Sequence, residues 1–129
     1  MMPRSPSKPK SKARIAAYRG GLRAEALAAW YLRCKFYRII ARRAKTPLGE
    51  IDLIVQRAGT IVFVEVKARA SAAREGETLE AVNQRRISHA AQYWLARHRA
   101  RADTDLRFDV IFLAPWRWPR HVINAFDVS

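Results

Sequence analysis

Two short apolar runs dominate the hydrophobic pattern of the chain, and both contain acidic residues. "EIDLIV" covers residues 50–55 and "TIVFVEV" covers residues 60–66, with "QRAG" between them. Both runs are rich in Ile and Val and have the length of a strand. Gly59 tolerates a positive φ, so the pattern predicts a β-hairpin that turns at Ala58–Gly59.

The rest of the pattern predicts helices and further strands around this hairpin. Apolar residues recur at helical spacing from near Leu22, after Gly20–Gly21, and again from about Leu79 to Arg97. Strands are expected at 36–42, 106–113 and 121–126, with loops at 44–49, 70–77 and 114–120. This order predicts an α/β or α+β fold with a mixed sheet flanked by helices. The strand after the second helix is expected to lie parallel to a neighbour.

Side chains alternate across a strand, and this alternation separates the acids of the first run from its apolar residues. Glu50 and Asp52 fall on one face of the predicted sheet. Ile51, Leu53 and Val55 fall on the other face. The acids are therefore expected to gather on one side of the hairpin.

The two-residue turn also sets the register, in which Asp52 faces Glu65 and Glu50 faces Lys67. Paired Cβ atoms lie about 5 Å apart. Two carboxylates at that distance repel by about 3 kcal/mol at an effective dielectric of 20. Such a pair persists if one carboxyl holds a proton, if a cation neutralises it, or if the site is wet.

A divalent metal is the most economical of these solutions. Mg²⁺ binds hard oxygen ligands, usually one or two carboxylates together with waters and substrate phosphates. Lys67 lies two residues beyond Glu65 on the same face, so metal, water and lysine could act together on a phosphodiester. The alternatives are an ordinary cross-strand ion pair between Glu50 and Lys67, and a solvated face that binds nothing.

Composition points to a nucleic-acid partner. The chain has 129 residues, half of them hydrophobic, which is enough for one domain with a packed core. Its 25 Lys and Arg against 11 Asp and Glu give a formal net charge of +14. Such a surface favours nucleic acids first and anionic membranes second. No run of about 18 apolar residues is present, so no membrane span is expected.

Residues 1–17 are expected to form a disordered basic arm and residues 18–129 the folded domain. "MMPRSPSKPKSKAR" is basic and rich in Pro and Ser, and no apolar segment of a secretory signal follows it. The arm could contact phosphates or act only as a solubilising tail. Cys34 is the one cysteine, so we expect a cytoplasmic protein with no internal disulfide and Cys34 buried at a helix end.

"GEIDLI" at 49–54 followed by "VFVEVKAR" at 62–69 resembles the YraN-like family of small bacterial proteins. That family is similar in pattern to archaeal Holliday-junction resolvases and belongs with the restriction-endonuclease-like PD-(D/E)xK superfamily. The resemblance extends from about Gly20 to Asp127 and includes "GLRAEALAAWYL", "RFDVIFL" and "INAF". It implies an α/β, restriction-endonuclease-like αβββαβ core and a metal-dependent nuclease site.

The resemblance also implies roles for individual residues. Asp52 and Glu65 would bind the metal together with the carbonyl of Val66. Glu25, on the first helix, would help to hold the metal or its water, although a lone acid there would more often be solvated or in a salt bridge. Lys67 would position the attacking water or stabilise developing charge.

Two positions near this motif, Ile51 and Gln84, also compare with the superfamily pattern. Ile51 stands where the superfamily often has a proline before the aspartate. The helix after the lysine often carries a Lys or Gln near the site, and here the run "NQRRI" places Gln84 at the edge of the site. We therefore include Gln84 among the expected catalytic residues, without metal ligation.

Basic residues near the motif are candidates for nucleic-acid contacts. Arg69 follows the second strand of the hairpin, and Arg85 and Arg86 lie on the second helix. Side chains of this type bind phosphates and fix the orientation of a nucleic acid. The alternative for the helix arginines is an ordinary solvated face.

Three further residues invite structural or functional interpretations. Asp109 lies in an apolar strand two residues from Arg107, which predicts a structural ion pair. Trp116 and Trp118 flank Arg117 in a Pro-punctuated loop. They are expected to pack in the core or cover the sheet edge, whereas the alternative is stacking on unpaired bases.

The combined expectation is an Mg²⁺-dependent endonuclease acting on DNA, with branched DNA as the favoured substrate and Mn²⁺ able to substitute. The alternative is a non-catalytic nucleic-acid-binding module with the same fold. A homodimer is expected by analogy with resolvases, because a four-way junction has two-fold symmetry.

Overall fold

The computed structural model describes residues 22–68, 81–98 and 104–126 of the chain. The described elements are a helix at 22–34, β1 (Arg38–Thr46), β2 (Gly49–Arg57), β3 (Thr60–Ala68), α2 (Ala81–Arg97), β4 (Asp105–Leu113) and β5 (Arg120–Val122). The strands form one sheet in the order β1-β2-β3-β4-β5. The β3–β4 pair is parallel and the other neighbours are antiparallel. The predicted α/β fold with a mixed sheet is therefore confirmed.

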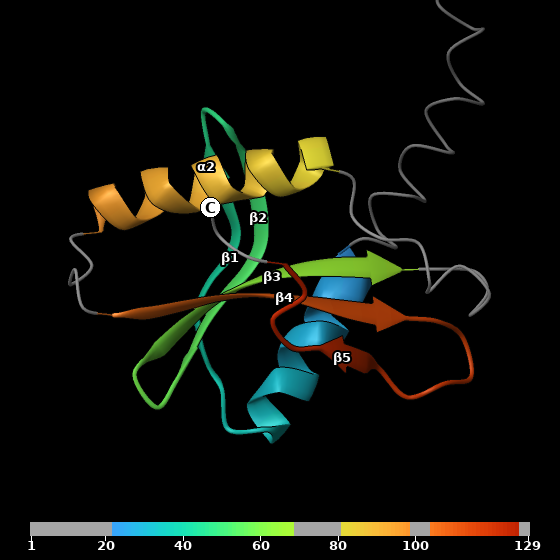
Figure 1. The fold of residues 1–129 in the computed structure, drawn as a ribbon. Coiled ribbons are helices and arrows are strands. Elements are labelled where there is room, and N and C mark those ends of the chain that lie inside the picture. The colour runs from blue at the N-terminus through green and yellow to red at the C-terminus, as the bar shows by residue number, and fades with distance from the viewer. Residues whose placement is uncertain (1–21, 69–80, 99–103, 127–129) are drawn as a thin grey trace, which may run out of the picture.

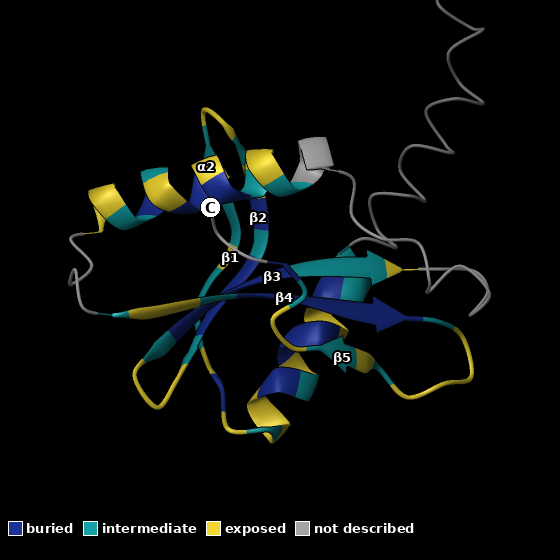
Figure 2. Ribbon diagram, in the orientation of Figure 1, coloured by how far each residue is buried: buried dark blue, intermediate teal, exposed yellow. Residues whose placement is uncertain are grey.

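One helix covers each face of the sheet (Figure 1). The helix at 22–34 packs on one face, and its cluster of buried residues comprises Ala28, Ala29, Leu32, Tyr37, Leu53, Val55, Val62, Val64, Ile111 and Leu113. On the other face, α2 contributes to a second cluster of Ile51, Ile54, Ile61, Phe63, Ala90, Ala91, Trp94, Phe108 and Phe126. Figure 2 shows the buried residues in the layers where the sheet meets the helices. This burial supplies the main stabilisation of the fold.

The β2–β3 hairpin has the predicted register. Its paired residues run from Arg57–Thr60 to Leu53–Val64. The turn residues Ala58 and Gly59 both have positive φ, 50° and 85°. Two positive φ values are the requirement of a type I′ turn, whose twist matches that of the strands.

The crossover after the hairpin brings β4 alongside β3 in parallel. Their register runs from Thr60–Asp105 to Ala68–Leu113. Parallel strands end at the same edge of a sheet, so the chain leaves β4 beside the carboxyl end of β3. The loop between β4 and β5 begins at this edge.

Strand boundaries and one cysteine differ from the predictions. β1 extends to Thr46, because the Thr46 hydroxyl donates to the carbonyl of Gly49 and accepts from the N–H of Leu48 to close the next turn. β5 ends at Val122, since Asn124 has a φ of 57° and the chain turns there. Cys34 is exposed, so its predicted burial is wrong.

The predicted arm at 1–17 and its boundary with the domain lie outside the described residues. Within the described ranges, no helix is both long enough and apolar enough to cross a membrane.

Candidate functional site

Asp52 and Glu65 lie where β2 and β3 stop pairing with each other. The ladder between these strands ends at Leu53–Val64. Immediately beyond it, Oδ2 of Asp52 accepts a 2.8 Å hydrogen bond from the backbone N–H of Val66. Asp52 and Glu65 were expected to pair within the ladder. Instead, the side chain of Asp52 accepts the hydrogen bond from Val66 that a backbone carbonyl of β2 would accept in a regular ladder. We call this part of the sheet the fork.

β3 continues past the fork beside β4. Glu65 pairs with Val110, and Lys67 pairs with Phe112. Nζ of Lys67 lies 3.2 Å from Oε1 of Glu65, and each side chain is 21% exposed. The cation of Lys67 thus lies beside Glu65, whereas the sequence also allowed a pair with Glu50.

The backbone of β1 is irregular at Arg43, the position opposite Asp52. Arg43 has a φ of 51°, a region that residues other than glycine occupy rarely. The residue pairs on either side of this position in the β1–β2 ladder are Arg42–Leu53 and Ala44–Ile51. Ala44 and Ile51 pack on the α2 face rather than the opposite one. The prediction that Ile51 shares a face with Leu53 is therefore wrong, because side-chain alternation breaks at Asp52.

The same irregularity lets two consecutive arginines reach one buried carboxylate. Nε of Arg42 lies 3.2 Å from Oε1 of Glu25, and Nη1 of Arg43 lies 3.5 Å from Oε2. Glu25, on the helix at 22–34, is only 3% exposed. A solvated Glu25 is thus excluded, and the salt-bridge alternative is confirmed. Nη2 of Arg43 also lies 3.5 Å from Oε1 of Glu50, so Arg43 bridges two acids.

Asp52 is the acid that this arrangement perturbs most clearly. Burial raises the pKa of its carboxyl from 3.8 to about 6. The hydrogen bond from Val66 opposes this rise, whereas the negative charges of Glu65, Glu25 and Glu50 add to it. Such a carboxyl is stabilised by a bound proton or by a cation.

The oxygen donors at the fork suit a hard divalent cation. Asp52 and Glu65 supply carboxylates. The backbone carbonyl of Val66, the residue between Glu65 and Lys67, is a third oxygen donor beside them. In the described part of the chain, no three His, Cys, Asp or Glu side chains converge as a metal cage. Mg²⁺ does not need one, because waters and substrate phosphates usually complete its octahedron.

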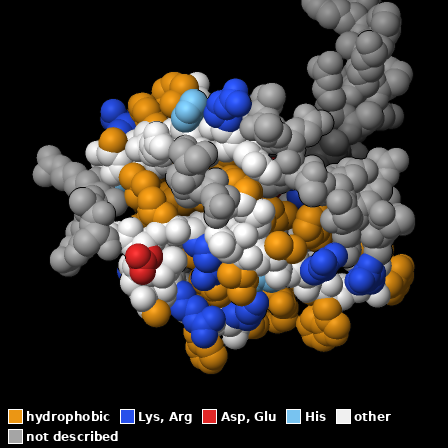
Figure 3. Space-filling model, in the orientation of Figure 1, with side chains coloured by type: hydrophobic (Ala, Val, Ile, Leu, Met, Phe, Trp, Pro, Cys, Tyr) orange, Lys and Arg blue, Asp and Glu red, His pale blue; other side chains and the backbone are white. Residues whose placement is uncertain are grey.

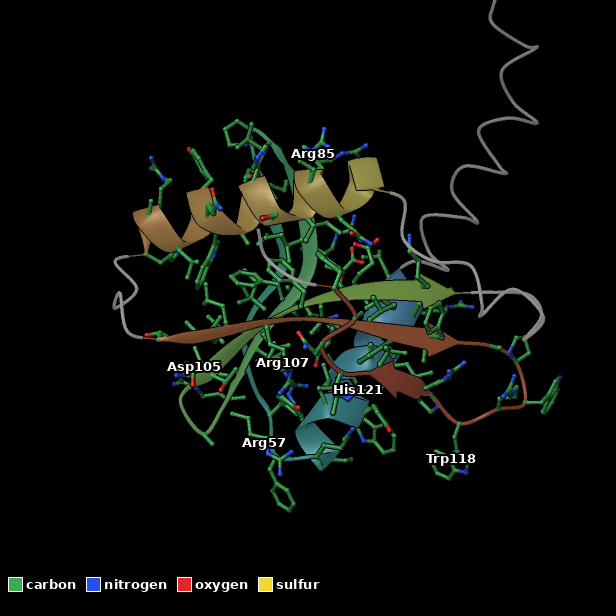
Figure 4. All side chains as sticks on the ribbon, viewed as in Figure 1. Arg57, Arg85, Asp105, Arg107, Trp118 and His121 are labelled. Carbon is green, nitrogen blue, oxygen red and sulfur yellow. The ribbon has the colours of Figure 1, made fainter. Side chains whose placement is uncertain are left out.

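The remaining predicted residues lie on α2 or outside the described ranges. Gln84 is half-buried on α2, and Arg85 is exposed on the side of α2 away from the sheet (Figure 4). Arg86 extends back to the sheet: a Cβ built on Gly49 would lie 3.1 Å from its Cδ. Arg86 therefore reaches Gly49, at the start of β2. Arg69 lies outside the described residues.

A second polar cluster lies under the other half of the sheet. Asp109, fully buried, accepts hydrogen bonds from Arg107 at 2.7 and 2.8 Å and from the N–H of Asn124 at 2.9 Å. Nε2 of His121 lies 2.7 Å from its Oδ2, and Arg107 also donates to the hydroxyl of Tyr37. Figure 4 shows Arg107 and His121 together below the sheet. The predicted structural Arg107–Asp109 pair is confirmed.

A mixed sheet covered by one helix on each face, with two acids and a lysine at a fork, is an α/β architecture consistent with a restriction-endonuclease-like core. The chain belongs to the uncharacterised protein family UPF0102, whose profile matches residues 24–113. This is the YraN family, so the resemblance seen in the sequence is confirmed.

Relatives with the name UPF0102 protein cover nearly the whole chain. One from Rhodopseudomonas palustris strain BisA53 is 49% identical over 125 residues, which is 97% of this chain and 96% of the relative. One from Parvibaculum lavamentivorans is 50% identical over 124 residues, covering 96% and 93%. One from Bradyrhizobium sp. strain BTAi1 is 51% identical over 124 residues, covering 96% and 91%. These names state no activity.

Proposed function

We propose that the protein is an Mg²⁺-dependent endonuclease that hydrolyses phosphodiester bonds in DNA, with branched DNA as its substrate. One observation carries this proposal: Asp52, a half-buried carboxyl with a raised pKa, lies among other acids at the fork. A site that disfavours its own negative charge gains free energy when a cation binds.

Asp52 and Glu65, with the carbonyl of Val66, would hold the metal. This oxygen-only donor set fits Mg²⁺, and Mn²⁺ can replace it at sites of this kind. A bound Mg²⁺ would lower the pKa of a coordinated water and offset charge on the scissile phosphate.

Lys67 is the residue that we assign to the reaction itself. Its ammonium lies 3.2 Å from Oε1 of Glu65 and is partly exposed, so a phosphate bound at the carboxylates would meet it. There it would hold the attacking water or stabilise the negative charge that develops on the phosphorus oxygens. Glu25 would act through Arg42 and Arg43, which it holds against the fork.

Arginines on α2 and after β3 would bind the DNA backbone. Arg86 crosses to the start of β2, and Arg85, the residue before it, is exposed on α2. We assign phosphate contacts to both and to Arg69, and Gln84 to the edge of the site. With a formal charge of +14, binding should weaken steeply as salt rises.

Cleavage of a DNA panel tests the proposal. Four-way junction, flap, single-stranded and blunt duplex DNA would be incubated with the wild-type protein in Mg²⁺, in Mn²⁺ and in EDTA. We expect metal-dependent cleavage, fastest on branched DNA, and no cleavage by Asp52→Asn despite retained binding. Cleavage that survives Asp52→Asn or EDTA would overturn the assignment.

A specific observation also favours the alternative, a non-catalytic nucleic-acid-binding module. Glu25, Glu50 and Glu65 already have basic partners from the chain itself. Acids neutralised in this way need no metal to be stable. This alternative predicts DNA binding that is the same in Mg²⁺ and EDTA, with no cleavage of any DNA in the panel.

A further inference from the structure

Two tryptophans project from the loop between β4 and β5. Trp116 is 100% exposed and Trp118 is 81% exposed. Figure 4 shows Trp118 pointing away from the sheet. Neither packs in the core nor covers the sheet edge, so those two expectations from the sequence are wrong. Full exposure of side chains this large and apolar is unusual and marks interaction sites.

The loop holds Trp116 in a constrained backbone. Trp116 has a φ of 64°, a conformation that a bulky side chain adopts only when its surroundings enforce it. Pro115 precedes it, and Pro119 ends the loop shortly before β5. The two prolines restrict the backbone on either side of the tryptophans, and backbone strain such as that of Trp116 concentrates at functional positions.

The loop begins at the edge of the sheet that carries the fork. Phe112, four residues before Trp116, pairs with Lys67 in the parallel ladder. With consecutive Cα atoms 3.8 Å apart and strands about 4.8 Å apart, the Cα atoms of Trp116 and Lys67 lie within about 20 Å. That distance corresponds to roughly six nucleotides of a DNA strand.

A surface groove adjoins the start of the loop, on the face of the sheet that the helix at 22–34 covers. A surface cavity of about 320 Å³ lies between the helix at 22–34 and the start of the loop. Its lining includes Ala24 of that helix, Ala68 at the end of β3 and Pro115, the residue before Trp116. Arg23 also lines it and supplies a positive charge.

Charge decides which partner the loop suits. No acidic residue occurs between Val110 and Phe126, whereas Arg117 separates the tryptophans and Arg120 begins β5. Basic and hydrophobic side chains lie together over this part of the surface in Figure 3. Alternating indoles and guanidinium groups match the bases and phosphates of a nucleic acid.

We propose that Trp116 and Trp118 stack on unpaired bases, so that the substrate is DNA with single-stranded or junction character beside the cleaved phosphate. Paired bases in a blunt duplex offer their faces only at the ends, whereas a junction, flap or gap exposes them along the strand. The inference rests on the proposed function for the nearby fork. Binding in EDTA tests it separately.

The test is fluorescence anisotropy of labelled single-stranded, four-way-junction and blunt duplex DNA, in EDTA. The proteins are the wild type, Trp116→Ala/Trp118→Ala, Trp116→Phe/Trp118→Phe and the control Trp30→Ala. Trp30 is 52% exposed on the helix at 22–34, so it controls for the loss of an exposed indole elsewhere. A 2-aminopurine placed at an unpaired position reports stacking directly through quenching.

We expect the double alanine variant to bind single-stranded and junction DNA about tenfold or more weakly, and duplex within about twofold. Quenching of 2-aminopurine should disappear in this variant. The phenylalanine variant and Trp30→Ala should keep both properties within about threefold. The slope of affinity against salt should not change, because an indole releases no counterions.

Wild-type affinity and quenching in the alanine variant, or equal losses on all three DNAs, would overturn this inference and leave the proposed nuclease standing. If the double alanine variant bound DNA as the wild type does but no longer self-associated in a sedimentation experiment, this inference would also fail. The loop would then be a protein–protein contact. If the wild type bound no DNA, both proposals would fail. Stacking without any cleavage in Mg²⁺ would support this inference and contradict the nuclease.

Discussion

The backbone N–H of Val66 donates a 2.8 Å hydrogen bond to the carboxylate of Asp52 at the point where β2 and β3 part. This contact joins the two strands beyond their ladder. It also fixes one oxygen of Asp52, whose pKa is raised to about 6 mainly by burial. The hydrogen bond thus fixes the geometry of the fork and opposes, without cancelling, the rise in pKa that burial causes.

Replacing Asp52 by Asn should stabilise the metal-free protein at neutral pH. Asn keeps an acceptor for the N–H of Val66 and removes the charge. The rise in pKa from 3.8 to about 6 means that the folded state binds more protons than the unfolded chain in this range. The stability of the wild type therefore falls as pH rises from about 4 to about 6.

Urea unfolding in EDTA measures the effect. Above about pH 6, Asp52→Asn should be more stable than the wild type by up to about 3 kcal/mol, and near pH 4 the difference should vanish. Asp105→Asn, an exposed acid at the start of β4, is the control and should change stability by less than about 0.5 kcal/mol. A destabilised Asp52→Asn protein at pH 7 would contradict this account of the fork.

Lys67→Ala should separate metal binding from the reaction. The lysine lies beside Glu65 but offers no lone pair to a metal while protonated. We expect cleavage about 10²- to 10³-fold slower and Mn²⁺ affinity within about threefold of the wild type. Single-turnover kinetics measures the cleavage rate, and calorimetry measures the Mn²⁺ affinity. Lys67→Arg, which keeps the positive charge, should retain part of the cleavage rate. If Lys67→Ala lost Mn²⁺ binding, the role of Lys67 would instead be to position the carboxylates that bind the metal.

Arg43 contributes a charge and occupies a strained backbone position, and two substitutions separate these effects. Arg43→Ala removes the cation between Glu25 and Glu50 and keeps a Cβ at a φ of 51°. Arg43→Gly removes the same cation but tolerates that φ. Both variants should unfold at lower urea concentration than the wild type. Arg43→Ala should lose about 2 kcal/mol of unfolding free energy, and Arg43→Gly should be about 1 kcal/mol more stable than Arg43→Ala. Equal stability of the two variants would show that the backbone there is not strained.

The hairpin and the parallel crossover followed from the sequence because both depend on local patterns. Runs of Ile and Val, a Gly after Ala58 and the spacing of two helices were sufficient. The break in alternation at Asp52 was not predictable from period-two patterning, and it lies opposite the positive φ of Arg43 in the neighbouring strand.

The residues around the candidate acids were found only in part. Glu25, Asp52, Glu65 and Lys67 came from the motif and its family resemblance. Arg42 and Arg43 were missed, although the pair "RR" within a strand is a signal that one of them must find a carboxylate. Likewise Asp109 and Arg107 were paired correctly as sequence neighbours, whereas His121 joins them across a distant segment that no local pattern relates to β4.

Acid should destabilise the protein through Asp109. Burial alone would raise the pKa of this carboxyl, but hydrogen bonds from His121, Arg107 and the N–H of Asn124 outweigh burial and lower it. Its contribution is therefore complete above about pH 4 and is lost as pH falls through the lowered pKa. Asp109→Asn should cost about 3–5 kcal/mol at pH 7 and flatten the loss of stability below pH 4. Thermal unfolding across pH measures this, with Asp105→Asn as the control. If Asp109 were not responsible, Asp109→Asn would lose stability below pH 4 as steeply as the wild type.

The central claim is that the fork between β2 and β3 is a divalent-cation site. Calorimetric titration of Mn²⁺ into the wild type, Asp52→Asn and Asp105→Asn tests it most directly, because it requires neither a substrate nor turnover. The account predicts one site in the wild type and in Asp105→Asn, and at least tenfold weaker binding in Asp52→Asn. No binding to the wild type, or equal binding to Asp52→Asn, would contradict it and favour the non-catalytic module.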